Sequence, residues 1–126
     1  MLRRDFFGKR RRMKRGEIWL INLDPTVGAE ISKQRPGLIM SEDGMGRLPL
    51  RIVAPITNWK AHYRVVPWMV ELPDDEQTGL DKHSSADCFQ VRSISERRMI
   101  RKIGEADPEL LRKAESGLKA VLGLTD

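Results

Sequence analysis

Short apolar runs separated by turn residues follow one another through most of this 126-residue chain. Runs rich in Ile, Val, Leu and Trp that are bounded by Gly, Pro and Asp are typical of β-strands. We expect strands at residues 17–23, 36–40, 51–56, 65–72, 86–94 and 99–103. Many short strands with a single helix predict a β-rich α+β domain, built as a small, partly open barrel of mostly antiparallel strands.

The segments between these runs are expected to be loops or turns. Residues 73–85 begin with an acidic run and predict a long exposed loop. Within the strands, Pro67 favours an edge or a bulge because proline has no N–H to donate. Residues 52–54 are entirely apolar and are expected to be buried on both faces.

One helix is predicted, near the end of the chain. Asp107 suits the N-cap, Pro108 the first helical position, and Gly123 the residue after the helix. Apolar residues recur between them at spacings of three and four, which makes a stripe that can pack on the sheet. The stripe comprises Leu111, Ala114, Leu118, Val121 and Leu122.

The positive charge of the chain is concentrated at its start. The net charge is +5, yet residues 1–15 hold eight Lys or Arg side chains against Asp5 alone, so the remainder is mildly acidic. Such a tail can bind nucleic acid nonspecifically through phosphates. Met13 is an alternative translation start, and a protein that begins there would not contain residues 1–12. We therefore expect a basic extension at 1–13, disordered or a start-site artefact, and a domain at 14–126.

Composition excludes several classes of protein. No apolar run approaches the roughly 20 residues that cross a bilayer, so no membrane association is expected. Cys88 is the single cysteine, which indicates a reducing cytoplasm. Together with His62 and His83 it does not match the usual zinc spacings, so we predict no metal and no cofactor. Both histidines are expected to be solvated loop residues.

Three polar residues lie where predicted strands begin or end: Glu30, Arg35 and Thr57. Chemistry is commonly placed on loops that a rigid scaffold holds. Arginine binds phosphate oxygens bidentately and keeps its charge, so an Arg near a carboxylate and a hydroxyl indicates phosphate chemistry that needs no metal. The alternative is structural, since an exposed Arg or Glu on a loop often only pairs with a neighbouring charge.

Five short motifs resemble, in order, those of the MazF/PemK family of toxins from bacterial type II toxin–antitoxin systems. They lie at residues 15–19, 24–30, 33–36, 55–57 and 90–94. The resemblance implies an SH3-like barrel of the CcdB/PemK type with a C-terminal helix, present as a cytoplasmic homodimer. It also implies a metal-independent, sequence-specific endoribonuclease that cuts single-stranded mRNA, stops translation and growth, and is bound by a cognate antitoxin.

The resemblance assigns Arg35, Thr57 and Glu30 to catalysis. RNA supplies the 2′-hydroxyl nucleophile, so Arg35 would stabilise the phosphorane and Thr57 would orient the scissile phosphate. Glu30 would remove the proton, although a glutamate pKa of about 4.3 must be raised for that task. The products would be a 2′,3′-cyclic phosphate and a 5′-hydroxyl. Some relatives have an Arg and an Asp just before the motif at 90–94; residues 87–89 do not reproduce that pair, so the general acid is not identified.

Aromatic residues after the motif at 55–57 are candidates for base stacking, because unpaired bases stack on aromatic rings. Trp59 has the best claim and Tyr63 is a further candidate, whereas Trp19 and Trp68 are expected in the core. The acidic run at 74–76 should lie away from bound RNA.

Other candidate RNA contacts come from the motifs and from the residues beside them. Gln90 and Arg92 are expected on one face of a single strand because side chains alternate. The full set of predicted RNA-binding residues is Gly16, Lys33, Asn58, Trp59, Gln90 and Arg92.

Two other functions fit the same kind of barrel. A gyrase poison of the CcdB type depends on an exposed Trp near the chain end, and residues 122–126 contain none. A non-catalytic nucleic-acid-binding barrel would bind without cutting, and the presence of both Arg35 and Thr57 argues against it.

Overall fold

The computed structural model describes residues 13–43 and 47–124; most of the basic extension, residues 1–12, lies outside the described residues. The described chain forms a seven-stranded sheet and the C-terminal helix α2 (Pro108–Leu122). The strands are β1 (Glu17–Asn22), β2 (Gln34–Ile39), β3 (Leu50–Asn58), β4 (Met69–Leu72), β5 (Ser84–Asp87), β6 (Arg92–Ser95) and β7 (Met99–Glu105). Three short 3-10 helices connect them: η1 (Ala61–Val65), η2 (Cys88–Gln90) and η3 (Glu96–Arg98).

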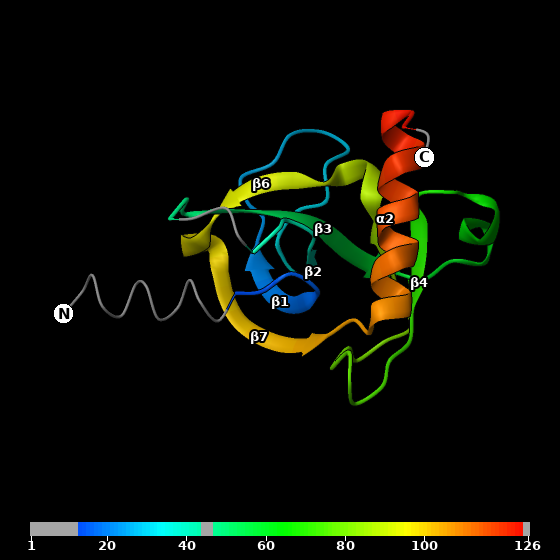
Figure 1. The fold of residues 1–126 in the computed structure, drawn as a ribbon, viewed down its shortest axis with the longest axis horizontal. Coiled ribbons are helices and arrows are strands. Elements are labelled where there is room, and N and C mark those ends of the chain that lie inside the picture. The colour runs from blue at the N-terminus through cyan, green and yellow to red at the C-terminus, as the bar shows by residue number, and fades with distance from the viewer. Residues whose placement is uncertain (1–12, 44–46, 125–126) are drawn as a thin grey trace.

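The sheet is antiparallel and strongly curved. Its order is β4-β5-β3-β2-β1-β7, and β6 adds to the other half of β3. The long strand β3 pairs with β5 at residues 56–58 and with β6 at residues 50–53. Figure 1 shows β7 curving past β1 while α2 stands beside β4. No pairing within the described residues joins β4 to β7, so the predicted small, partly open barrel with a C-terminal helix is confirmed.

Side chains of the central strands alternate between two apolar clusters. Ile18 and Leu38 belong to the cluster that α2 covers, whereas the next residues, Trp19 and Ile39, belong to the cluster on the other face. Trp19 therefore lies in the core, as predicted. Fully burying an Ile or Leu side chain stabilises the fold by roughly 1.5–3 kcal/mol relative to leaving it exposed. Both faces of β1 and β2 are thus covered, which fixes the strands that carry the candidate site.

The helix begins and ends where the sequence predicts. The Asp107 carboxylate accepts the N–H of Leu110 at 2.8 Å, which caps the first turn. Gly123 takes a left-handed conformation with φ of 68°, and the N–H of Leu124 reaches the carbonyl of Lys119. The apolar stripe is narrower than predicted, because Leu122 is exposed.

Two predicted strands are wrong in extent. The strand at 86–94 is two strands, because η2 turns the chain from one half of β3 to the other. The Asp87 carboxylate accepts the N–H of Phe89 at 3.0 Å and so stabilises this break. The strand at 65–72 is only β4, since Val65 ends η1 and Pro67 cannot donate to a ladder. Ile52, predicted to be buried, is 43% exposed.

The loop between β4 and β5 is not the fully exposed segment that the sequence predicts. Thr78 and Leu80 are buried. A Cβ atom on Gly104 of β7 would lie 2.3 Å from the carbonyl oxygen of Thr78, and one on Gly79 would lie 2.2 Å from that of Ile103. Backbone therefore packs directly on backbone, which fixes this loop against β7.

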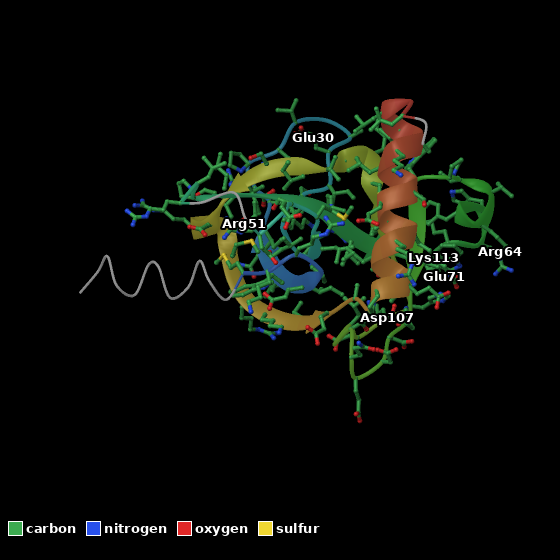
Figure 2. The ribbon with its side chains drawn as sticks, in the orientation of Figure 1. Glu30, Arg51, Arg64, Glu71, Asp107 and Lys113 are labelled. Atoms are coloured by element: carbon green, nitrogen blue, oxygen red, sulfur yellow. The ribbon has the colours of Figure 1, made fainter. Side chains whose placement is uncertain are left out.

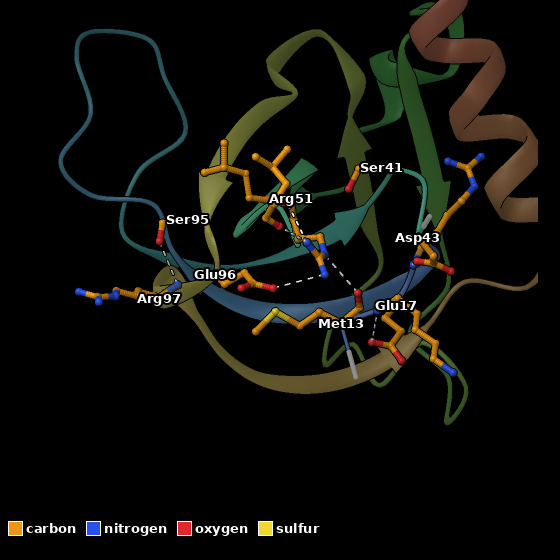
Figure 3. A network of polar contacts seen from close by, with 12 residues as sticks. Met13, Glu17, Ser41, Asp43, Arg51, Ser95, Glu96 and Arg97 are labelled. Atoms are coloured by element: carbon orange, nitrogen blue, oxygen red, sulfur yellow. Dashed lines mark hydrogen bonds and ion pairs between the residues drawn. The ribbon is translucent and has the colours of Figure 1, made fainter. Parts of the chain in front are cut away.

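The first described residue is part of the core. Met13 is 1% exposed, and its carbonyl accepts the Arg51 Nε–H at 3.2 Å. Arg51 also pairs with the buried Glu96, at 3.3 Å (Figure 3). The sequence assigned Met13 to the extension, whereas its side chain packs with Trp19 and other members of the second cluster.

Candidate active site

Arg35 and Thr57 line the same cavity, called the first cavity below, which measures about 360 Å³. β2 and β3 pair with Gly37 opposite Pro55 and Leu38 opposite Ala54. Continued to the start of β2 and the end of β3, this register sets Arg35 beside Thr57. The structure thus brings together two residues that are far apart in the sequence.

The first cavity lies between the sheet and the loop that precedes β5. Cross-strand neighbours from β7, β1 and β2 line it, namely Arg101, Leu20 and Pro36. Residues 79–82 of the β4–β5 loop line it from the other direction. The remaining lining residues are Ile56, Asn58, Ser84 and Ile103. Of the predicted RNA contacts, Asn58 lies here.

The first cavity has an excess of positive charge. Arg35, Lys82 and Arg101 line it, and Asp81 supplies the opposing carboxylate. The Arg35 Nε–H donates to the carbonyl of Ser32 at 3.1 Å, and among the described residues its two Nη groups have no partner. The guanidinium is therefore held at one edge while its other donors can receive an anion. Lys82 and Arg101 were not predicted as site residues, since no local sequence pattern places them beside Arg35.

Glu30 lies elsewhere. It lines a second cavity of about 510 Å³, with Pro55, Gln90 and Arg92 among its other lining residues. Figure 2 shows Glu30 on the loop between β1 and β2. Its carboxylate accepts the N–H of Val27 at 2.6 Å and is exposed. The three predicted catalytic residues therefore do not share one cavity in this conformation.

Gln90 holds the loop that carries Glu30. Its Oε1 accepts the N–H of Ile31 at 2.7 Å, and its Nε2 donates to the carbonyl of Ala29 at 3.5 Å. Arg92 donates to the carbonyl of Leu23, at 3.0 Å. The prediction that Gln90 and Arg92 share one strand face is wrong, because Gln90 belongs to η2.

Burial shapes the ionisation of two neighbouring residues. Desolvation raises the pKa of the Asp87 carboxyl, and the N–H groups of Phe89 and Gln90 oppose that shift. Burial, with the charge of Asp87 as the lesser cause, raises the pKa of the Cys88 thiol to about 12. Cys88 is therefore a buried thiol and not a nucleophile.

The aromatic residues after β3 form a cluster of their own. Trp59 stacks on His83 with ring centroids 5.5 Å apart, and Tyr63 meets Trp59 edge-on at 5.9 Å. The Nε2 atom of His83 lies 2.6 Å from the Glu71 carboxylate. His83 is exposed, as predicted for a loop histidine, but it is paired rather than only solvated. Trp68, half-buried, packs against the first core cluster.

Besides Trp59, two predicted RNA contacts, Gly16 and Lys33, lie outside both cavities. The Gly16 N–H donates to the carbonyl of Ile39 at 2.9 Å, and its φ of 88° explains the glycine. Lys33 is exposed, and its N–H donates to Asp24 at 2.9 Å. Neither residue lines the first or the second cavity.

Neither a metal-binding cluster of side chains nor a membrane-spanning helix is present among the described residues. No group of three or more His, Cys, Asp and Glu side chains at 13–43 and 47–124 is arranged to hold a metal ion. None of the helices in the described part of the chain is both long and apolar enough to span a bilayer.

The family of this chain follows from its similarity to known proteins. Residues 14–122 match the model of the PemK-like, MazF-like toxins of type II toxin–antitoxin systems. The chain belongs to this toxin family. It is 36% identical over 118 residues to the endoribonuclease MazF9 of Mycobacterium tuberculosis, covering 89% of this chain and 98% of that protein. It is 33% identical over 115 residues to the endoribonuclease EndoA of Bacillus subtilis, covering 90% and 97%.

Solved structures of the toxin family agree with the fold. The crystal structure of MazF from Deinococcus radiodurans superposes with a TM-score of 0.76, at 24% sequence identity, and covers 89% of this chain and 97% of that one. The barrel and the C-terminal helix described above are therefore those of a MazF structure.

Proposed function

We propose that this family member is the toxin of a type II toxin–antitoxin system and an endoribonuclease that cuts single-stranded mRNA without a metal ion. The observation that carries the proposal is the first cavity, which Arg35 and Thr57 both line together with further cations. The names of two relatives, both endoribonucleases, support the reaction class. A gyrase poison or a non-catalytic barrel has no comparable support.

The proposed reaction uses the nucleophile that RNA itself carries. The 2′-hydroxyl attacks the adjacent phosphorus and the bond to the 5′-oxygen breaks. The departing 5′-oxygen takes up a proton from water, so the products end in a 2′,3′-cyclic phosphate and a 5′-hydroxyl. The Nη groups of Arg35 stabilise the additional negative charge of the phosphorane. The Thr57 hydroxyl donates to a nonbridging oxygen and orients the phosphate for in-line attack.

Proton removal from the 2′-hydroxyl requires a base within hydrogen-bond reach. Glu30 can serve only when the β1–β2 loop carries its carboxylate to the first cavity, because in this conformation it lines the second. Asp81 is the carboxylate that lines the first cavity here. Both residues belong to the proposal, and their variants separate them.

The proposed partners follow from the family. A toxin of a type II system is bound by a cognate antitoxin, and we expect a homodimer as the active form. The family match spans residues 14–122, and the proposed domain also includes the buried Met13 that precedes it. The free thiol of Cys88 fits a reducing cytoplasm, where mRNA is translated.

The test is cleavage of a long single-stranded RNA by the full chain in excess EDTA, with Arg35→Ala and Thr57→Ala alongside. We expect discrete fragments with 5′-hydroxyl ends from the wild type, and a rate lower by about 100- to 1,000-fold in Arg35→Ala. Equal cleavage by wild type and Arg35→Ala would refute the assignment of Arg35. Dependence on added metal would refute the metal-independent mechanism.

A further inference from the structure

The first cavity contains two cations to which the proposed reaction gives no role. Lys82 comes from the β4–β5 loop and Arg101 from β7, so they reach the first cavity from different elements. Both side chains are exposed. Within residues 13–43 and 47–124, neither has a hydrogen-bonding or ionic partner in the protein. Cations without partners that line a shared cavity attract an anion more strongly than isolated surface charges do.

The backbone holds both residues in place before any ligand binds. Arg101 is paired with Leu20 across β7 and β1. Lys82 follows the segment that packs on β7 at Gly79, and its carbonyl accepts the Ser84 hydroxyl at 2.6 Å. Because their backbone is fixed, less conformational entropy is sacrificed when an anion binds them.

The charge balance determines what the first cavity can accept. Three cations, including Arg35, face the single carboxylate of Asp81, so one phosphodiester bound at Arg35 leaves positive charge uncompensated. The next phosphodiester of an RNA chain is covalently linked to the first and must lie nearby. We propose that Lys82 and Arg101 form a subsite for a backbone phosphate of single-stranded RNA, next to the scissile phosphate. This subsite rests on the proposed function, since that function places RNA in the first cavity.

The experiment compares the full chain with the double variant Lys82→Gln/Arg101→Gln. One arm measures kcat and KM on an RNA with a single cleavage site. The other measures, between about 50 and 300 mM salt, the affinity for the same sequence with 2′-deoxyribose at the cleavage site, which cannot be cut. The matched control is Arg112→Gln/Lys113→Gln on α2, which removes the same two charges from a groove formed with β4. Thermal unfolding verifies that each variant folds.

We expect KM to rise about 10-fold or more in the subsite variant while kcat stays near the wild-type value, because RNA touches the subsite both before and during the reaction. The slope of log affinity against log salt should become shallower by about 0.7 for each phosphate that the variant no longer neutralises. The α2 control should keep the wild-type slope.

Two results would overturn the subsite: a salt slope equal to that of the wild type, or an equal change of slope in the α2 control. The two arms also separate this inference from the proposed function. A wild type that binds the uncleavable RNA but cuts nothing refutes the function, and its salt slope still tests Lys82 and Arg101.

Discussion

The Oε1 atom of Gln90 accepts a hydrogen bond of 2.7 Å from the backbone N–H of Ile31. The next residue, Ser32, provides the carbonyl to which the Arg35 Nε–H donates. η2 is therefore linked through two loop residues to the guanidinium in the first cavity. Both polar atoms of the Gln90 amide bond to the β1–β2 loop in this conformation, so we predict that Gln90 positions the loop that holds Arg35.

Gln90→Ala should loosen this loop and lower kcat. A hydrogen bond of this kind contributes about 1 kcal/mol, so exchange of the Ile31 amide hydrogen should be several-fold faster. Gln90→Glu keeps the acceptor and should keep the slow exchange of that amide. Hydrogen exchange followed by NMR measures both variants. If Gln90→Ala raised KM and left exchange at Ile31 unchanged, Gln90 would be an RNA contact instead.

Replacing each carboxylate by the uncharged amide distinguishes between the two candidate bases, Glu30 and Asp81. Glu30→Gln keeps an acceptor for the Val27 N–H, so in the described conformation its effect on kcat should stay below about 10-fold. Asp81→Asn removes the carboxylate of the first cavity and should lower kcat by about 100-fold or more if that group takes the proton. Single-turnover rates across a pH range of about 5–9 are the measurement. The reverse order of effects would show that the β1–β2 loop carries Glu30 to the phosphate.

Removing the Met13 side chain should destabilise the fold. It is 1% exposed and packs in the second core cluster, so Met13→Ala should cost about 2–5 kcal/mol of unfolding free energy. The exposed neighbour Lys14 is the control, and Lys14→Ala should change stability by less than about 0.5 kcal/mol. Urea unfolding followed by tryptophan fluorescence measures both. Equal stabilities would mean that the domain does not need Met13.

The Cys88 thiol should be unreactive in the folded protein. Its pKa is raised to about 12 by burial, so at a pH of about 8 almost no thiolate is present. Alkylation by iodoacetamide should be at least about 100-fold slower in the native chain than in urea, where the pKa returns towards 9.0. Mass spectrometry of timed samples gives both rates. Rapid labelling of the native protein would contradict the burial described here.

Features encoded by neighbouring residues were predictable from the sequence. The cap at Asp107 and the left-handed Gly123 depend only on residues within one turn, and both appear where expected. The break at η2 was missed because it depends on β3, which is long enough to pair with two strands in succession. An apolar run does not reveal that its partner strand changes.

The candidate site was predictable in part for the same reason. Arg35 and Thr57 belong to motifs that the resemblance identified, and their positions on paired strands bring them together. Lys82 and Arg101 join them only because the β4–β5 loop folds back on β7. That packing joins segments far apart in the chain and has no local signature.

The close packing of Gly79 and Gly104 limits how this cavity can change during evolution. An insertion in the β4–β5 loop, or a larger residue at either glycine, would push this loop away from β7. The barrel itself would then be disturbed, because the loop packs directly on that strand. New substrate preferences are therefore expected from side chains that line the first cavity without supporting the barrel or the proposed chemistry, such as the exposed Asn58 at the end of β3. Variation at residue 58, with both glycines retained, is the pattern to select for when redesigning which RNA the protein accepts.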